Sequence, residues 1–258
     1  MDRLDGFARS AWARVRSGYY SAPTWGATRP ARSLAGAVRE RRGRAVVAEV
    51  KPRSPTEPDL LRGRGVGELA RAYLAGGAVG ISVLVDPDHF GGSLAYLREL
   101  SGLGVPLLAK DFVVDPAQLE AYARAGADCA LLIMALFRRG HTSHGPGEMI
   151  DRAHALGLEV LLEVSSAGEL EEALGTEADL IGINSRDLAT LELDPRRPAA
   201  VLREVAPRDP RPILALSGIS SPEEVRALRE AGFAGFLVGT ALLRAPDPAA
   251  LVRELAAA

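Results

Sequence analysis

Eight short apolar segments recur along the chain, and a helix-like segment separates each from the next. The apolar segments are Ala45–Val50, Gly80–Val85, Pro106–Ala109, Cys129–Ile133, Glu159–Glu163, Leu180–Ile183, Pro212–Leu216 and Gly235–Val238. Their length and β-branched content are typical of buried strands. The segments between them have the spacing of amphipathic helices, and several end at glycine, which is a frequent helix C-cap.

Strands that alternate with helices and are apolar along their length predict a parallel sheet covered by helices. Eight such units fit a (β/α)8 TIM barrel, which typically has about 250 residues. A doubly wound open sheet is the alternative, but even spacing of the units favours closure. Residues 1–44 have the pattern of one or two further helices, which we expect to cover a barrel end or the mouth of the site. We therefore predict one domain over residues 1–258, with a helical extension over 1–44 and a barrel over 45–258.

The composition excludes several classes of protein. Of the 258 residues 47% are hydrophobic and 25% charged, and a formal net charge of -2 provides no positive field for nucleic acid. The single cysteine, Cys129, cannot form an intramolecular disulfide. We find no signal-peptide pattern and no apolar run near the ~20 residues of a membrane helix. We therefore expect a cytoplasmic protein without nucleic-acid or membrane partners, and a monomer is the simplest state.

The first predicted strand carries two ionisable residues, Glu49 and Lys51, among apolar neighbours. Because side chains alternate faces along a strand, residues two positions apart point the same way. A carboxylate beside an ammonium group at the end of a buried strand is costly for folding and useful for proton transfer. A structural ion pair would have the same sequence, so this segment alone leaves both interpretations open.

Polar residues also follow the other predicted strands, at the ends where barrel enzymes place their active sites. These ends carry Asp86 with His89, Lys110 with Asp111, Glu163, Asn184 with Arg186 and Asp187, Ser217 with Gly218, and Gly239 with Thr240. We expect an acid–base cluster of Glu49, Lys51, Lys110 and Glu163. In one pocket, two lysines and two glutamates shift one another's pKa values and divide acid and base roles. Asp111 and Asp187 have a simpler interpretation as helix caps.

The last two strand ends have the composition of a phosphate site. Ser217-Gly218 and Gly239-Thr240 each precede a predicted helix. Glycine allows close backbone approach, and a helix N-terminus presents unpaired N–H groups. Since the loops after the last two strands form the usual phosphate site of such barrels, we expect a phosphorylated substrate. Glycines that serve only tight turns are the alternative.

Three other features are weaker candidates. The glycine-rich segment 63–67 lacks the Rossmann spacing, and we interpret it as a mobile loop. His141 and His144 provide too few nearby imidazoles for a metal site, so an exposed loop and no metal are expected. The aromatic residues of the extension are interpreted as packing residues: Trp12, Tyr19, Tyr20 and Trp25.

Nine segments at or near the predicted strand ends carry recognisable patterns: Ala48–Pro55 (E-x-K-x-x-S-P), Ile81–Leu84, Phe90–Ser93, Lys110–Phe112 (K-D-F), Leu131–Ile133, Glu163–Val164, Gly182–Leu188 (I-N-S-R-D-L), Ser217–Ile219 and Gly235–Gly239. Together these segments resemble the indole-3-glycerol phosphate synthase family. They occur in the family's order, and the N-terminal extension is also similar. The glycine motifs are shared with many phosphate-binding barrels, whereas the three spelled patterns together are highly specific.

The resemblance implies a carboxy-lyase of tryptophan or indole-derived metabolite biosynthesis. Family members close the ring of 1-(2-carboxyphenylamino)-1-deoxyribulose 5-phosphate, with loss of carbon dioxide and water, to give indole-3-glycerol phosphate. No metal or organic cofactor is implied, because the arylamine itself is the electron source. An isomerase of the neighbouring step is an alternative, but it needs an Asp or Cys acid–base pair and Cys129 lies in apolar sequence.

The resemblance also implies roles for single residues, which are assigned here by their positions in the matching motifs. Lys110 would be the general acid of ring closure, and Lys51 a second acid that attracts a substrate anion. Glu49 and Glu163 would orient the lysines and transfer protons, and Asn184 would bind the sugar chain. The rest of the substrate would meet Ser54, Pro55, Phe90, Phe112, Leu131, Arg186, Leu188 and Ser217. Backbone amides for the phosphate would come from Gly218, Gly239 and Thr240.

One position departs from the family. The family pattern is similar to S-E-S-G-I, whereas this chain has Leu216 before Ser217. Leu216 can neither exchange a proton nor balance a lysine charge. Loss of a hydrogen-bonded carboxylate from an active site commonly raises the activation free energy by a few kcal/mol. Three outcomes are open: a slower synthase, a paralogue that acts on a modified substrate, or a phosphate-ligand-binding barrel without turnover in a biosynthetic complex. The retained lysines and glutamates make the third the least expected.

Overall fold

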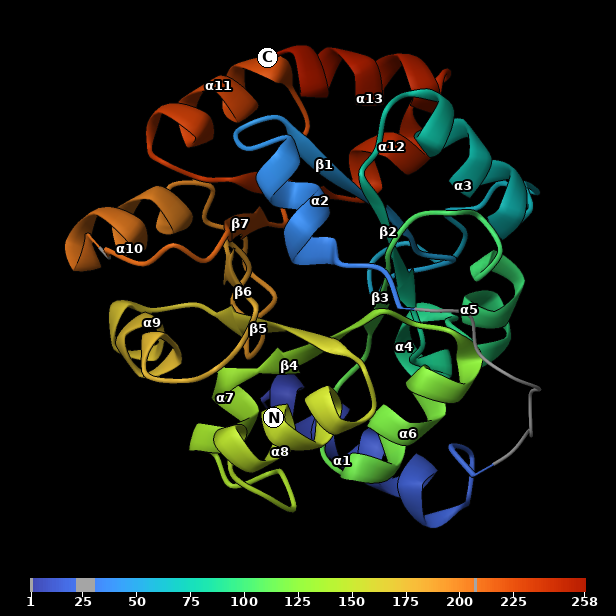
Figure 1. The fold of residues 1–258 in the computed structure, drawn as a ribbon. Helices are drawn as coiled ribbons and strands as arrows, with labels where there is room; N and C mark the ends of the chain where they lie inside the picture. The colour runs from blue at the N-terminus through green and yellow to red at the C-terminus, as the bar shows by residue number, and fades with distance from the viewer. Residues whose placement is uncertain (1, 22–30, 207) are drawn as a thin grey trace.

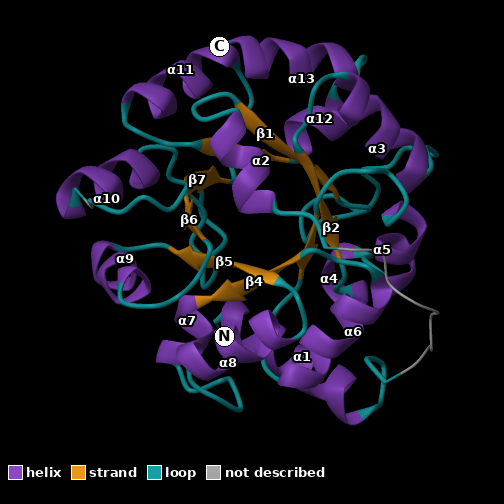
Figure 2. Cartoon of the chain, in the orientation of Figure 1, coloured by secondary structure: helices purple, strands orange, loops and turns teal. Residues whose placement is uncertain are grey.

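The computed structural model describes residues 2–21, 31–206 and 208–258. Its parallel strands form a closed barrel in chain order: β1 (Ala45–Val50), β2 (Gly80–Leu84), β3 (Leu107–Lys110), β4 (Cys129–Ile133), β5 (Glu159–Val164), β6 (Leu180–Asn184), β7 (Ile213–Leu216) and β8 (Gly235–Val238). β1 pairs with both β2 and β8, which closes the ring in Figure 2. The predicted TIM barrel is therefore confirmed, and every predicted strand end lies within about one residue of the observed end.

Helices surround the barrel (Figure 1). They are α3 (Val66–Ala75), α4 (Pro87–Phe90), α5 (Leu94–Leu100), α6 (Pro116–Ala125), α7 (Met134–Arg138), α8 (Pro146–Ala155), α9 (Ala167–Leu174), α10 (Arg197–Val205), α11 (Pro222–Glu230), α12 (Thr240–Arg244) and α13 (Pro248–Ala257). Capping boxes begin α6 at Asp115 and α11 at Ser221. The glycine-rich segment 63–67 is not a loop throughout, because α3 begins at Val66. Within the described ranges, no helix has the length and apolar character needed to cross a membrane.

The core lies on both faces of the barrel wall. Side chains such as Val46, Leu132 and Ile181 belong to the cluster between strands and helices. Their neighbours Val47 and Leu131 belong to a second cluster inside the barrel. This alternation follows from the two-residue period of a strand, and it directs every second side chain of each strand end toward the barrel axis.

The N-terminal extension contributes one helix to each end of the barrel. α2 (Leu34–Glu40) lies over the end where the strands begin, and Glu159 of β5 accepts hydrogen bonds from its first amides. α1 (Arg3–Arg16) lies at the opposite end, where its Phe7 lines a cavity. The extension therefore covers a barrel end with one helix and the mouth of the site with the other.

Aromatic residues of the extension pack on the barrel. Tyr20 is buried, and Trp12 Nε1 donates a hydrogen bond of 2.7 Å to the His141 carbonyl. Trp25 lies outside the described residues. His141 is half-buried rather than exposed, because its imidazole also pairs with Asp5 at 2.9 Å.

Candidate active site

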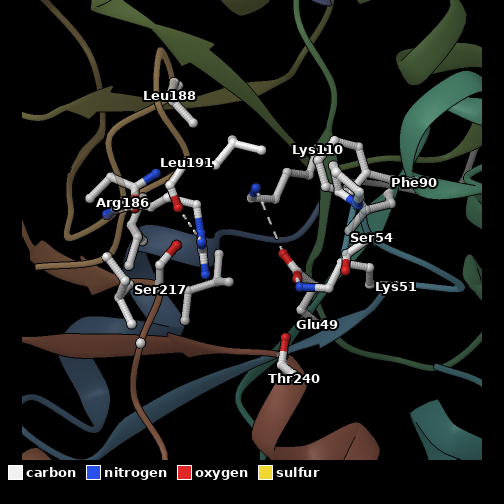
Figure 3. Close-up of a pocket in the computed structure, with 18 of the residues that line it drawn as sticks. Glu49, Lys51, Ser54, Phe90, Lys110, Arg186, Leu188, Leu191, Ser217 and Thr240 are labelled. Atoms are coloured by element: carbon white, nitrogen blue, oxygen red, sulfur yellow. Dashed lines mark hydrogen bonds and ion pairs between the residues drawn. The ribbon is translucent and has the colours of Figure 1, made fainter. Parts of the chain in front are cut away.

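A cavity of about 440 Å³ opens where the strands end. Its lining includes each residue to which the sequence assigns a site role: Glu49, Lys51, Ser54, Pro55, Phe90, Lys110, Phe112, Leu131, Glu163, Asn184, Arg186, Leu188, Ser217, Gly218, Gly239 and Thr240. Every strand or the loop after it contributes, which is how active sites form in this fold. Figure 3 shows Glu49 and the lysines on one side of the cavity, with Arg186 and Ser217 on the other.

Glu49 lies between the two lysines. Its Oε1 accepts a hydrogen bond of 2.9 Å from Lys51 Nζ, and its Oε2 lies 3.8 Å from Lys110 Nζ. Burial acts to raise the pKa of Glu49, but the ammonium groups of Lys51 and Lys110 outweigh burial and lower this pKa. Glu49 is therefore held ionised, and it fixes both ammonium groups at the cavity.

Glu163 is a second buried carboxylate, and its pKa is shifted in the direction opposite to that of Glu49. Asn184 Nδ2 donates a hydrogen bond of 2.8 Å to Glu163 Oε1, and Oε2 has no partner among the described residues. Burial raises the pKa of Glu163, and the opposing effects of Lys110 and Asn184 are smaller. Asn184 is itself fixed, because its Oδ1 accepts a hydrogen bond of 2.9 Å from the Arg186 amide. Two carboxylates with pKa values pushed apart are suited to separate acid–base roles.

The scarcity of lysine in this chain is a further signal of function. Lys51 and Lys110 are the two lysines of the whole sequence, and every other long cationic side chain is arginine. Arginine stays protonated in proteins, whereas the lysine ammonium can release a proton. Both amines lie in one cavity, which favours proton transfer over a purely structural ion pair.

Backbone groups form the side of the cavity near β7 and β8. Ser217 and Gly218 both have left-handed backbone, with φ values of 67° and 74°. Gly239 leaves no room for a side chain, since a Cβ atom there would lie 2.6 Å from Glu49 Oε1. Short loops that contain glycine allow a ligand to approach their backbone amide groups closely, and Thr240 adds a hydroxyl group. This composition suits an anion such as phosphate.

Phe7 is a cavity residue that the sequence motifs do not identify. Its ring stacks on Phe112 with a centroid distance of 4.4 Å and an interplanar angle of 18°. The ring of Phe90 lies 6.1 Å from that of Phe112. Together they give the cavity an aromatic wall. A single apolar residue in α1 has no local signal that distinguishes cavity lining from core packing, so only the tertiary contact reveals it.

A buried charge cluster holds α1 beside this wall. Arg14 is 6% exposed, and its guanidinium lies 3.0 Å from Asp86, 3.0 Å from Asp111 and 3.0 Å from the Tyr20 hydroxyl. Asp111 is therefore not the helix cap that the sequence indicates. Asp187 is not a helix cap either, because it lies in a turn, where its Oδ1 accepts hydrogen bonds from the Ala189 and Thr190 amides.

Asp86, Asp88 and His89 form the one group in the described part of the chain whose ligand atoms are close enough for a cation. Arg14 already lies against both aspartates, at 3.0 Å and 2.5 Å. The guanidinium supplies the positive charge that a metal would bring. This group is therefore best described as an ion-pair cluster.

Leu216 lies in the cavity wall beside Asn184, its register partner in β6. It is 1% exposed, and its side chain packs on Gly182, where a Cβ atom would lie 2.6 Å from Leu216 Cδ1. Gly182 is the register partner of Glu163. The side chain of Leu216 thus gives an apolar surface next to the Asn184–Glu163 pair.

The fold and the cavity define a (β/α)8-barrel enzyme with a lysine–carboxylate site. The sequence model of a family described as indole-3-glycerol phosphate synthase matches residues 13–255. The chain is 45% identical to the indole-3-glycerol phosphate synthase of Methanopyrus kandleri, over 83% of this chain and 83% of that protein. It is 41% identical to that of Thermococcus kodakarensis, over 86% of this chain and 96% of that protein. The chain belongs to the indole-3-glycerol phosphate synthase family.

A solved structure with low sequence identity shares the fold. The thiamine phosphate pyrophosphorylase from Pyrococcus furiosus superposes with a TM-score of 0.59, at 18% identity. The match covers 84% of this chain and 95% of that chain. At this identity the likeness concerns the barrel alone.

Proposed function

We propose that this protein closes the ring of 1-(2-carboxyphenylamino)-1-deoxyribulose 5-phosphate to give indole-3-glycerol phosphate, carbon dioxide and water. The observation that carries the proposal is the cluster of Glu49, Lys51, Lys110 and Glu163 in one cavity between an aromatic wall and a glycine-rich backbone wall. Each part of the substrate matches one part of the cavity. Its aromatic ring suits the aromatic wall, its carboxylate and ketone suit the lysines, and its phosphate suits the glycine-rich backbone wall. The reaction belongs to tryptophan or indole-derived metabolite biosynthesis.

Ring closure joins the ring carbon that bears the carboxylate to the ketone carbon. The ketone oxygen gains negative charge as this bond forms, and Lys110 protonates it. Lys51 attracts the substrate carboxylate, and Glu49 keeps both lysines in place. Loss of carbon dioxide then returns its bonding electrons to the ring system. One proton is taken up from solvent in each turnover, because a carboxylate leaves as a neutral gas.

Dehydration completes the reaction. The new hydroxyl group leaves as water with a proton from an acid, for which Lys51 is the candidate. A base then removes one proton from the five-membered ring, which restores aromaticity. Glu163 suits this step, because burial raises its pKa toward neutrality and its Oε2 is unpartnered within the described residues. Asn184 orients Glu163 through its hydrogen bond to Oε1. The backbone amides of Gly218, Gly239 and Thr240 hold the phosphate during these steps.

The test is direct, since the product is an indole and the substrate is not. Purified protein is mixed with the carboxyphenylamino-ribulose phosphate, and indole fluorescence is followed. We expect fluorescence to rise with wild-type protein, and to rise at least about 100-fold more slowly with Lys110→Ala. Absence of product at high enzyme concentration, with the circular dichroism of a folded barrel, would overturn the proposal.

Leu216 favours a second candidate, a paralogue that closes the ring of a modified substrate. Its apolar side chain lies next to Asn184, where a charged residue would bind water or a substrate dipole. An apolar surface instead suits a substituent such as a methyl group. Comparison of kcat/KM for the unsubstituted substrate and its ring-methylated analogues separates the two candidates. A preference of more than about tenfold for an analogue would favour the paralogue.

A further inference from the structure

The loop after β7 begins with backbone strain. Ser217 has a φ of 67°, although it carries a side chain. The left-handed region costs a residue with a Cβ atom about 1–2 kcal/mol, and only Gly218, the next residue, adopts it without strain. Such a conformation persists where surrounding groups fix it, and it is common at ligand sites. A specific contact should therefore hold Ser217 in place.

Ser185, the first residue after β6, makes this contact. It is 1% exposed, and its backbone amide donates a hydrogen bond of 3.0 Å to the Leu216 carbonyl. Its hydroxyl lies 2.8 Å from the Ser217 carbonyl and 3.1 Å from the Leu216 carbonyl, so one proton is shared between two acceptors. No role for Ser185 follows from the motif or from the proton transfers described above.

The two carbonyls belong to the two peptide groups that flank the Cα atom of Ser217. Fixing both peptide planes fixes φ and ψ of the residue between them. In a trans peptide the C=O and N–H groups point in opposite directions. Since the carbonyls point to Ser185, the amides of Ser217 and Gly218 point away from it. Ser217 and Gly218 line the cavity in front of the buried Ser185.

We infer that Ser185 is a positioning residue that sets the backbone amides of Ser217 and Gly218 for binding the anionic end of the substrate. The identification of that anion as a phosphate rests on the proposed function. Ser185 does not touch the ligand, and it acts through the peptide groups on either side of Ser217. It thereby couples the loop after β6 to the loop after β7.

The first experiment measures binding of inorganic phosphate to the resting protein by titration calorimetry, and then KM and kcat. For Ser185→Ala we expect about tenfold weaker phosphate binding, which corresponds to one hydrogen bond, and a similar rise in KM. We expect kcat to change less than about twofold, because the lost interaction is with a remote group. Ser185→Cys serves if the alanine variant is unstable, because its slightly larger thiol fills the site but is only a weak hydrogen-bond donor.

The matched control is Ser166→Ala. The Ser166 hydroxyl caps α9 by accepting a hydrogen bond from the Glu169 amide, far from the loop after β7 in sequence. This variant loses a comparable hydrogen bond and some stability, but it should bind phosphate like the wild type. If Ser185→Ala also lowers only stability and leaves phosphate affinity unchanged, Ser185 is merely structural and the inference fails.

A second experiment tests the strain directly. In a Ser217→Gly background the left-handed backbone is free of strain, so Ser185→Ala should weaken phosphate binding less than about twofold. In a Ser217→Ala background the strain remains, and the loss should again be about tenfold. Equal losses in the two backgrounds would contradict the inference.

The two proposals fail separately. If the wild-type protein binds no phosphate, the amide site is absent and the inference is overturned, whether or not an indole is formed. If phosphate binds and depends on Ser185, but no indole is formed from the substrate, the inference stands and the proposed function fails.

Discussion

Glu49 Oε1 accepts a hydrogen bond of 2.9 Å from Lys51 Nζ, at the end of the first barrel strand. Removing two charges from water in this way costs several kcal/mol per ion before the pair compensates it. The same carboxylate lies 3.8 Å from Lys110 on β3, so it serves two ammonium groups. A structural ion pair needs one partner of each sign. A carboxylate shared by the two lysines of the sequence is better explained by chemistry in the cavity.

Lysine and arginine substitutions distinguish proton transfer from charge alone. We expect Lys110→Ala to lower kcat by about 10²–10⁴-fold, which is the usual contribution of a general acid. Lys110→Arg keeps the charge but should remain similarly slow, because guanidinium does not release its proton. Lys51→Arg should retain more activity than Lys110→Arg, since part of the role of Lys51 is to attract an anion. Single-turnover indole fluorescence measures all three rates.

Circular dichroism of each lysine variant provides the control for folding. A Lys110→Arg protein with the wild-type rate would contradict the assignment of Lys110 as an acid. A Lys51→Arg protein slower than Lys110→Arg would assign the principal proton donor to Lys51 instead.

The strands could be predicted from sequence because a barrel strand is apolar on both faces. A run such as Cys129–Ile133 has no competing interpretation once a helix pattern follows it, and its ends agree with β4. The same alternation predicts that Glu49 and Lys51 share a face, as observed. The residues at strand ends meet because parallel strands of one barrel end on one side.

Contacts between distant segments could not be predicted. Arg14 reads as one of many arginines on an amphipathic helix, and only the folded chain brings it to Asp111, which lies 97 positions away. The interpretation of Asp111 as a cap used local sequence and was therefore wrong. The φ of Ser217 is equally hidden, since serine gives no signal for a left-handed conformation. The local sequence pattern was sufficient to predict the helices and strands. It could not predict the side-chain contacts and backbone conformations that depend on polar groups far apart in the sequence.

Removal of Arg14 tests how the extension is held. Arg14→Met leaves Asp86 and Asp111 buried without their cation, so we expect a loss of about 3–5 kcal/mol in the free energy of unfolding. Arg16→Met is the control, because Arg16 is an exposed residue of the same helix. Urea unfolding measures both. If the two variants are equally stable, the buried cluster contributes nothing net, and α1 is held by its apolar face alone.

The opposite pKa shifts of Glu49 and Glu163 predict that these residues affect the stability of the fold in opposite ways as pH changes. Burial raises the pKa of Glu163 in the folded protein, so its contribution is fully present below the unfolded pKa of about 4.3 and is lost as pH rises through the folded pKa. Glu163→Gln has no charge to bury. We therefore expect this variant to match the wild type in stability near pH 4 and to exceed it near pH 7, while its activity falls.

Glu49→Gln is the matched comparison. The lysines lower the pKa of Glu49 against the effect of burial, so its contribution is present above the unfolded pKa and is lost as pH falls through the folded pKa. We expect Glu49→Gln to be less stable than the wild type near pH 7 and to approach it in acid. Unfolding midpoints measured across pH give both curves. The same sign for both variants would contradict the assigned charge states.

Substitution of Leu216 tests the departure from the family. Leu216→Glu puts a carboxylate next to Asn184, the register partner of Leu216, and restores the glutamate that the sequence resemblance predicts at this position. We expect the rate on the unsubstituted substrate to rise by about 10–100-fold, since a hydrogen-bonded charge in an active site is commonly worth a few kcal/mol. Stability should fall, because a carboxylate replaces a side chain that is 1% exposed and packs on Gly182.

Leu216→Gln separates charge from shape in this experiment. Glutamine has nearly the size of glutamate but cannot exchange a proton, so its rate should stay near that of the wild type. If Leu216→Gln is as fast as Leu216→Glu, a dipole beside Asn184 is sufficient and proton exchange is not the missing function. If Leu216→Glu is slower than the wild type while the fold is intact, the prediction is wrong. Leu216 then belongs to a cavity adapted to a different substrate, and the ring-methylated analogues become the substrates to compare.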